Sequence, residues 1–179
     1  QRRFTRVRIG GRQPVDGATA AERIATSEFT KVATSWSPDG SAVAYHEQGD
    51  IFILRLEPGS KAVPFVNSRA RERLAAFSPS GNWLAYASDE SGESAIYVTT
   101  FPRAAGKWQV SAGGGSEPRW SADGSEIFYL DPERTLTAVA VRTGTAVTFS
   151  SGPPRPLFRA PVRPPISNTD FFSYDVTKD

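Results

Sequence analysis

Short stretches in which apolar and polar residues alternate run along this chain, separated by residues that favour turns. Strands are the expected structure, because a period of two places every second side chain on one face of a sheet. In the first clear unit the turn is Pro38-Asp39-Gly40, where Pro presets φ, Asp can bond its own backbone and Gly tolerates a positive φ. The pattern predicts four strands in this unit, at 31–37, 42–47, 51–56 and 63–66.

The same arrangement follows twice more along the chain. The predicted strands are 74–78, 83–87, 95–101 and 108–111 in the second unit, and 118–121, 126–130 and 136–141 in the third. Two stretches, 147–149 and 157–159, compete for the outer strand of the third unit. Residues 4–9 and 171–177 are expected to be strands of a preceding and a following unit, and 17–26 predict a helical turn or a loop.

The three units repeat one sequence pattern at fixed offsets. Each contains an aromatic residue, Trp36, Phe77 or Trp120, followed four residues later by Gly and nine residues later by Tyr. These aromatic residues are 41 and 43 residues apart. Strand-rich repeats of about 40 residues are typical of propeller blades, and the even spacing of whole units favours a propeller over a sandwich. The sequence therefore predicts an all-β fold, a β-propeller fragment of about three full four-stranded blades with partial blades at both ends.

The repeated aromatic residues are predicted to be core residues between neighbouring blades. Burial of a large aromatic side chain contributes about 2–3 kcal/mol. The alternative is that they form an aromatic cage around a ligand. The residues concerned are Trp36, Phe77, Trp120, Tyr45, Tyr86 and Tyr129.

The repeat divides the chain into five segments. Residues 1–30 are predicted to be the end of a preceding blade with a connecting loop, and 166–179 the start of a further blade. The full blades are 31–71, 72–115 and 116–165. Propellers close with about four to eight blades, so we expect the remaining blades or a second copy of the chain to close the ring.

Composition excludes several classes of protein. The chain is 39% hydrophobic and 22% charged, which is ordinary for a globular protein. A net charge of +2 gives no general attraction to nucleic acid, and no apolar run approaches the roughly 18 residues of a membrane span. The absence of Cys excludes disulfides and Cys-based metal sites. The chain also contains no Met, so we expect it to be a fragment or a processed segment.

Few residues are candidates for catalysis. His46 is the only histidine, so a Ser-His-Asp triad or a histidine metal site would have to use it. It follows Tyr45 on a predicted strand, so it should point to the opposite face as an ordinary strand residue. No Gly-x-Ser-x-Gly motif is present either. The sequence predicts no catalytic residue.

Two other features resemble ligand sites but have structural interpretations. Asp39, Asp123 and Asp179 occupy equivalent turn positions, where capping of the turn is expected and calcium binding is the alternative. Gly113-Gly114-Gly115-Ser116 lacks the Lys-Ser/Thr of a phosphate loop and precedes a strand. It is predicted to connect two blades. No cofactor and no metal are therefore expected.

Several strings carry a resemblance to a known repeat. They are TSWSPDG at 34–40, residues 77–101 with DESG at 89–92, GKWQVS at 106–111 and GGGSEP at 113–118, and YDV at 174–176 also fits. They resemble the Tol-type propeller repeat, the WD-like blade of TolB and its relatives, over 32–129 and more weakly in the tails. Within that group the chain is most similar to the propeller segment carried by some bacterial serine/threonine kinases. Ser80 and Ala122 depart from the Pro-Asp-Gly turn but keep its Gly.

The resemblance implies six or more blades, a binding role and a periplasmic or other extracytoplasmic location. In a propeller the first strand of each blade lines the central channel. Lys31, Glu72, Arg73, Glu117 and Arg119 lie just before the repeated aromatic residues and are the predicted binding residues at the channel mouth. Their mixed charge suits a polar protein or peptide partner.

The predicted function is a non-catalytic binding module that presents its loops and channel mouth to a protein or peptide, as the sensor or scaffold part of a larger bacterial protein. The alternative is the propeller domain of an enzyme: a lyase, a lactonase or the gate domain of a serine peptidase. A third hypothesis is structural support of another domain.

Overall fold

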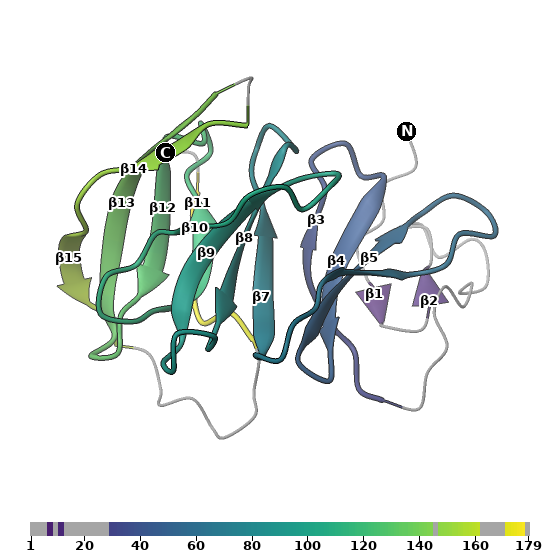
Figure 1. Cartoon of the computed structure of the whole chain (residues 1–179), viewed down its shortest axis with the longest axis horizontal. Coiled ribbons are helices and arrows are strands. Elements are labelled where there is room, and N and C mark those ends of the chain that lie inside the picture. Colours follow the sequence, from purple (N-terminus) through teal and green to yellow (C-terminus); the bar gives the residue numbers. More distant parts are fainter. Residues whose placement is uncertain (1–6, 9–10, 13–28, 145–146, 162–170, 178–179) are drawn as a thin grey trace.

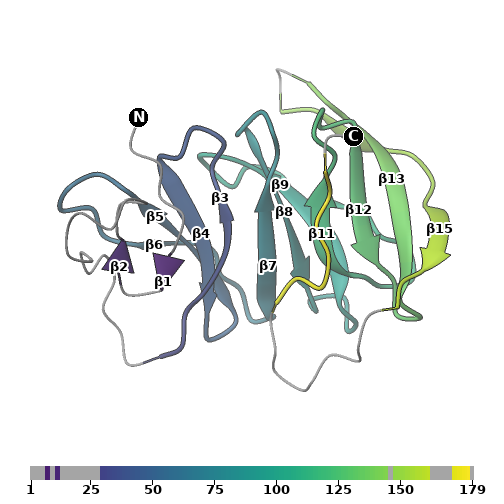
Figure 2. The same ribbon diagram turned by 180° about the vertical axis from the view of Figure 1, so that it is seen from behind.

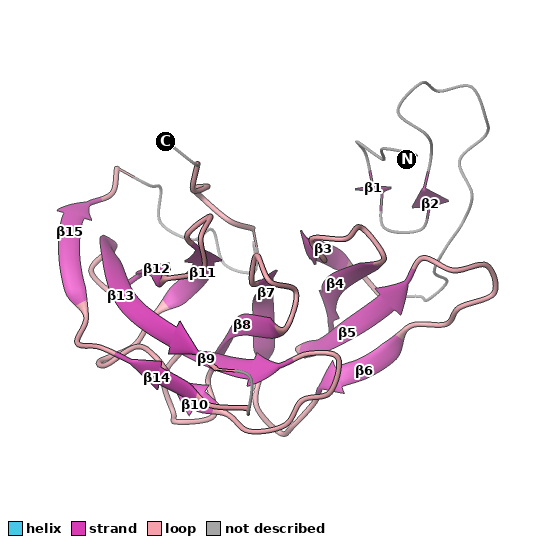
Figure 3. Ribbon diagram, turned by 90° about the horizontal axis from the view of Figure 1, so that it is seen from above, coloured by secondary structure: helices cyan, strands magenta, loops and turns pink. Residues whose placement is uncertain are grey.

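Three antiparallel sheets stand side by side in this protein, with no helix among the described residues (Figure 1). The computed structural model describes residues 7–8, 11–12, 29–144, 147–161 and 171–177. Seen from above, the sheets are arranged as an open arc, with the first strand of each on the concave side (Figure 3). None of the described residues belongs to a helix long and apolar enough to cross a membrane.

The first two sheets are the predicted four-stranded blades. Their strands follow one another in sequence order, and the predicted bounds differ from the observed ones by two residues or fewer. In the first blade they are β3 (Val32–Trp36), β4 (Ala42–Glu47), β5 (Asp50–Arg55) and β6 (Val63–Val66). In the second they are β7 (Glu72–Phe77), β8 (Trp83–Ser88), β9 (Ala95–Thr100) and β10 (Trp108–Gln109).

The third blade has a longer third strand and a divided outer edge. Its strands are β11 (Ser116–Trp120), β12 (Glu126–Leu130), β13 (Thr135–Thr143), β14 (Phe149–Ser151) and β15 (Arg155–Arg159). Both stretches that competed for the outer strand form. β14 pairs with the end of β13 and β15 with its beginning, so together they cover one edge.

The ends of the chain differ in part from expectation. The predicted strand 4–9 contains β1 (Val7–Arg8), which pairs with β2 (Gly11–Arg12) in a short hairpin. The rest of that stretch and residues 17–26 lie outside the described residues. The prediction that 171–177 forms a strand is wrong: no strand is assigned there. A strand needs a hydrogen-bonded neighbour, and no other strand of a further blade is among the described residues.

The inner strands share one register with the strands that follow them. Trp36 is opposite Val43, Phe77 is opposite Leu84, and Trp120 is opposite Ile127, an offset that is the same in each blade. Each inner strand then contains a bulge or irregularity, which lies between Ala33 and Ser35 in the first blade. A bulge bends its strand, so the beginning of each inner strand is redirected in a similar way.

The turn after each aromatic residue has the geometry that its sequence predicts. The carboxylate of Asp39 accepts hydrogen bonds from Ser37 Oγ at 2.6 Å and from Ser41 N at 3.0 Å. Asp123 has the same partners in the third blade. Gly40, which ends the turn, has a φ of 71°, a value that only glycine adopts without strain. Asp39 and Asp123 therefore cap turns, as predicted, and Asp179 lies outside the described residues.

The core lies between the blades. One cluster of buried side chains joins the first and second blades, and another joins the second and third. Phe77, Tyr86, Trp120 and Tyr129 belong to these clusters, which confirms the prediction for four of the six repeated aromatic residues. Tyr45 is 4% exposed but belongs to neither cluster. Trp36 is half-buried. Its equivalent Trp120 packs on the preceding blade, and no full blade precedes Trp36 among the described residues.

The third blade turns a second apolar face away from the rest of the arc. Ile127 and Tyr129 face the second blade, so Phe128 faces the other way. Phe128 is opposite Ala138. The equivalent pair in the second blade is Ala85 and Val98, and the third blade buries both of those residues. Phe128 is only half-buried, as is Leu136, and Phe158 on β15 opposite Leu136 is 58% exposed. We call Phe128, Leu136 and Phe158 the open face.

Candidate functional site

The five predicted channel-mouth residues all lie on inner strands or just before one. Lys31 immediately precedes β3, Glu72 and Arg73 begin β7, and Glu117 and Arg119 belong to β11. These strands are neighbours on the concave side of the arc (Figure 3). The fold thus brings the five residues to one region, although their contacts differ.

Lys31 and Glu72 are both bonded to other residues of the chain. Lys31 Nζ lies 3.2 Å from the carboxylate of Glu47, at the end of β4, and both side chains are largely buried. Glu72 is 1% exposed, and its carboxylate accepts a hydrogen bond from Ser68 Oγ at 2.5 Å. Burial raises the pKa of Glu72 above its usual range, and the hydrogen bonds from Ser68 oppose that shift.

The backbone at Glu72 makes a contact between blades that recurs. Glu72 N donates to Gly49 O, in the β4–β5 turn of the preceding blade, at 2.5 Å. Gly115, five residues before Trp120 as Glu72 is before Phe77, donates in the same way to Ser94 O at 2.7 Å. The entries of β7 and β11 are therefore fixed to the preceding blade.

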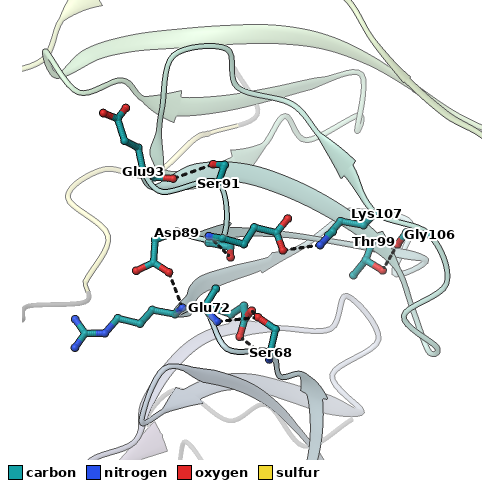
Figure 4. Close-up of polar contacts among 12 residues, drawn as sticks. Ser68, Glu72, Asp89, Ser91, Glu93, Thr99, Gly106 and Lys107 are labelled. Carbon is teal, nitrogen blue, oxygen red and sulfur yellow. Dashed lines mark hydrogen bonds and ion pairs between the residues drawn. The ribbon is translucent and has the colours of Figure 1, made fainter.

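Acidic residues of the β8–β9 turn lie beside the start of β7 (Figure 4). Asp89 accepts a hydrogen bond from Arg71 N at 2.7 Å, which ties the turn to the start of β7. Glu90 forms an ion pair with Lys107 at 2.5 Å. Arg73, paired with Ala87 of β8, is half-buried beside them. These carboxylates therefore bind donors of the chain itself.

Glu117 binds a segment that is distant in sequence. Its carboxylate accepts hydrogen bonds from Ser173 N and from Ser173 Oγ, the latter at 2.9 Å, and its carbonyl accepts one from Tyr174 Oη at 2.7 Å. Burial raises the pKa of Tyr174, so this phenol stays a donor at neutral pH. Glu117 has a φ of 57°, and Leu74 at the equivalent point of β7 has one of 53°.

Arg119 binds the same segment through a different chemistry. Its guanidinium carbon lies 3.5 Å from the centre of the Phe172 ring, a cation–π contact. Its Nε lies 3.7 Å from Asp175 Oδ1. Burial lowers the pKa of Arg119, and Asp175 opposes that shift by favouring the charged form. Figure 2 shows this last segment, in yellow, running along β11.

The segment 172–175 was not among the predicted binding residues. Its contacts join residues more than 50 positions apart, so no local pattern indicates them. The only signal was the match of Tyr174-Asp175-Val176 to the start of a blade, a place beside the preceding inner strand. We call Glu117 and Arg119, which hold this segment, the mouth pair.

The other sequence candidates occupy structural positions. His46 is buried in β4, between Val32 of β3 and Ile51 of β5. Gly115 lies where a Cβ would come 2.8 Å from the ring of Tyr129, so close packing explains its glycine. It belongs to the connection between β10 and β11, as predicted. Within the described ranges, no group of three or more His, Cys, Asp or Glu residues could hold a metal ion.

Comparison with known proteins identifies the fold. No family model and no curated protein matches the sequence. A putative TolB from Agrobacterium tumefaciens matches with a TM-score of 0.58 and 19% identity, over 83% of this chain and 56% of that one. TolB from Acinetobacter baumannii matches with a TM-score of 0.36 and 15% identity, over 83% of this chain and 48% of that one. The Cps50 (Swd1) β-propeller domain of Myceliophteria thermophila matches with a TM-score of 0.48 and 10% identity, over 82% of this chain and 66% of that one.

The chain is thus all-β and has the architecture of an open part of a β-propeller. Within that class, its similarity to the putative TolB of Agrobacterium tumefaciens shows that its fold is TolB-like. The chain spans about half the length of that protein.

Proposed function

We propose that this chain is part of a non-catalytic β-propeller whose channel mouth binds a protein or peptide partner. The observation that carries the proposal is the contact of the mouth pair with residues 172–175. Glu117 accepts a main-chain N–H and a hydroxyl, while Arg119 binds an aromatic ring and a carboxylate. A main-chain N–H is present in every polypeptide, and a segment with hydroxyl, aromatic and acidic side chains presents the other three groups.

The other predicted residues have supporting roles in this proposal. Lys31 and Glu72 hold the entries of their strands through the contacts with Glu47 and Ser68. Arg73 contributes positive charge to the rim. A rim with fixed main chain and both signs of charge selects a partner by complementarity, because little further ordering is needed on binding.

The whole ring is the working unit in this proposal. Either further blades or a second copy of the chain covers the open face of Phe128, Leu136 and Phe158. The sequence resemblance supports an extracytoplasmic location in a bacterium. It also supports a parent protein, such as a serine/threonine kinase, in which the propeller serves as sensor or scaffold.

A labelled peptide tests binding at the mouth. The probe is a fluorescein-labelled peptide with the sequence of residues 171–177, FFSYDVT, added to the full chain and followed by fluorescence anisotropy. Tyr174→Ala removes the bond to Glu117 O and loosens the chain's own segment, so this variant should bind the peptide several-fold more tightly than the wild type.

Charge variants decide whether the mouth pair is responsible. Adding Arg119→Gln to Tyr174→Ala should abolish the gain, whereas adding Arg55→Gln, a change of an exposed arginine at the end of β5, should not. Failure of both chains to bind the peptide, or equal effects of the two arginine changes, would contradict the proposal.

A further inference from the structure

A cavity of about 630 Å³ lies between the second and third blades, at the end where the inner strands finish. Three connections line it. The β7–β8 turn provides Asn82, the β9–β10 loop provides Phe101 and Arg103, and the β13–β14 loop provides Val147. The mouth pair lies on β11, and no residue of β11 lines this cavity. We call it the interblade cavity.

The length of β13 explains why the cavity forms here. β13 has nine residues, whereas β5 and β9, its equivalents, have six each. Three more residues extend a strand by about 10 Å. This extension accompanies a wall of the cavity that Thr143, Gly144 and Val147 form, facing the β9–β10 loop.

A cluster of three rings anchors that wall. Phe149 of β14 lies 5.6 Å from Trp83 and 5.7 Å from Trp108, measured between ring centres, and the two indoles are 5.5 Å apart. Trp83 also lines the cavity. The facing loop is fixed as well: Thr100 Oγ1 donates to Arg103 O at 2.6 Å and accepts from Ala105 N at 2.9 Å. These contacts hold β14 and the β9–β10 loop in place, and ligand pockets are usually built on such fixed elements.

The lining combines an apolar body with one positive charge. Trp83, Phe101, Pro102 and Val147 provide the apolar part, and Val147 is 49% exposed although it is a large hydrophobic residue. Arg103 provides the charge. Among the described residues no carboxylate lies within ion-pair distance of its guanidinium. A free guanidinium beside an apolar wall suits an anion that carries a hydrophobic group.

We infer that the interblade cavity binds a small organic acid with a flat apolar body. The body packs between Trp83, Phe101 and Val147, and the carboxylate accepts hydrogen bonds from Arg103, with Asn82 as a second polar partner. The volume is within the usual range for small-molecule pockets, about 300–1,000 Å³. The site is independent of peptide binding at the channel mouth, since it uses other loops.

Two probes of equal shape test the inference on the full chain. 3-Phenylpropionate should bind with a dissociation constant of about 1 mM, the affinity expected for a ligand of this size. Its neutral analogue 3-phenylpropanamide should bind about fivefold more weakly. Two-dimensional ¹H–¹⁵N NMR titration provides the affinity, and the shifted signals should include those of Asn82, Thr143 and Gly144.

Arginine variants assign the charge. Arg103→Gln should weaken binding of the acid about fivefold and leave the amide unchanged, while Arg142→Gln, an exposed arginine of β13 outside the cavity lining, should change neither. Val147→Glu should weaken the acid more than the amide, and a thermal melt of each variant confirms folding. No saturable binding of the acid, equal binding of the two probes, or shifts confined to other residues would overturn the inference.

Discussion

The indole Nε1 of Trp120 donates a hydrogen bond to the carbonyl oxygen of Ala76, across the boundary between two blades, at 3.1 Å. Both residues belong to inner strands and both are buried. Phe77 occupies the equivalent position in the second blade, so a phenylalanine ring fits this place in the fold. The bond joins neighbouring blades at the point where their inner strands meet.

Trp120→Phe should therefore destabilise the chain by about 1–3 kcal/mol, because the substitution removes the donor to a buried carbonyl. Urea unfolding followed by circular dichroism measures the change. Trp108→Phe is the control, since Trp108 is half-buried in an outer strand and makes ring contacts only. If the two variants lose equal stability, the hydrogen bond between blades is not what Trp120 contributes.

Ser80→Asp should stabilise the second blade. Ser80 replaces the aspartate of the other two turns, and its Oγ lies 3.0 Å from Ser78 Oγ and 3.4 Å from Asn82 N. A carboxylate there can accept both bonds as Asp39 does, so the melting temperature should rise by about 1–2 °C. Ser80→Ala, which removes the acceptor, should lower it; a higher melting temperature for the alanine variant would refute the turn model.

The turn aspartates should make stability depend on acid pH. The hydrogen bond from Ser37 lowers the pKa of Asp39 from an ordinary 3.8 to about 2, and Ser121 does the same for Asp123. A lowered folded-state pKa stabilises the fold above the ordinary value, and this contribution is lost as the pH falls toward 2.

The double variant Asp39→Asn/Asp123→Asn measures this contribution. Its melting temperature should be lower than that of the wild type at pH 5 to 7, with the difference shrinking between about pH 4 and 2. Asp131→Asn is a single-site comparison outside these turns, because the Asp131 carboxylate also accepts a hydrogen bond from a main-chain N–H, that of Thr135. A difference that is constant over the whole range would contradict the assigned pKa shifts.

Glu117→Ala should release the segment 172–175 from β11. The substitution removes the carboxylate that accepts the hydrogen bond from Ser173 N. It also changes the main chain at Glu117, whose carbonyl oxygen accepts from Tyr174 Oη. Amide hydrogen exchange at Ser173 should therefore become several-fold faster. Glu133→Ala, a change of an exposed glutamate in the β12–β13 turn, is the matched control. Unchanged exchange at Ser173 in the Glu117 variant would show that other contacts hold the segment.

Most of the blade structure follows from local sequence. The alternation of apolar residues and the Pro-Asp-Gly turns locate the strands of the first two blades, because strand period and turn chemistry act over a few residues. The repeated offsets then identify Tyr86 and Tyr129 as core residues. The end of β13 is different: Arg142 and Thr143 are polar, and they are in a strand because they pair with Ser150 and Phe149.

The candidate site was predictable in position but not in its contacts. An inner strand is recognisable from the repeat, so Glu117 and Arg119 could be placed on one from the sequence. Their partners Phe172 and Ser173 depend on how a distant segment returns to β11. The interblade cavity was not predicted, because it depends on the extra length of β13 and on how its loop meets that of another blade.

Sedimentation velocity of the isolated chain tests most directly whether its three blades form an arc of a larger ring. The open face should make the wild-type chain associate as its concentration rises, because exposed apolar blade faces favour pairing. Phe128→Lys should abolish association, while Val63→Lys, which changes an exposed valine of the first blade's outer strand, should not. A wild-type chain that stays monomeric at every concentration would contradict the account.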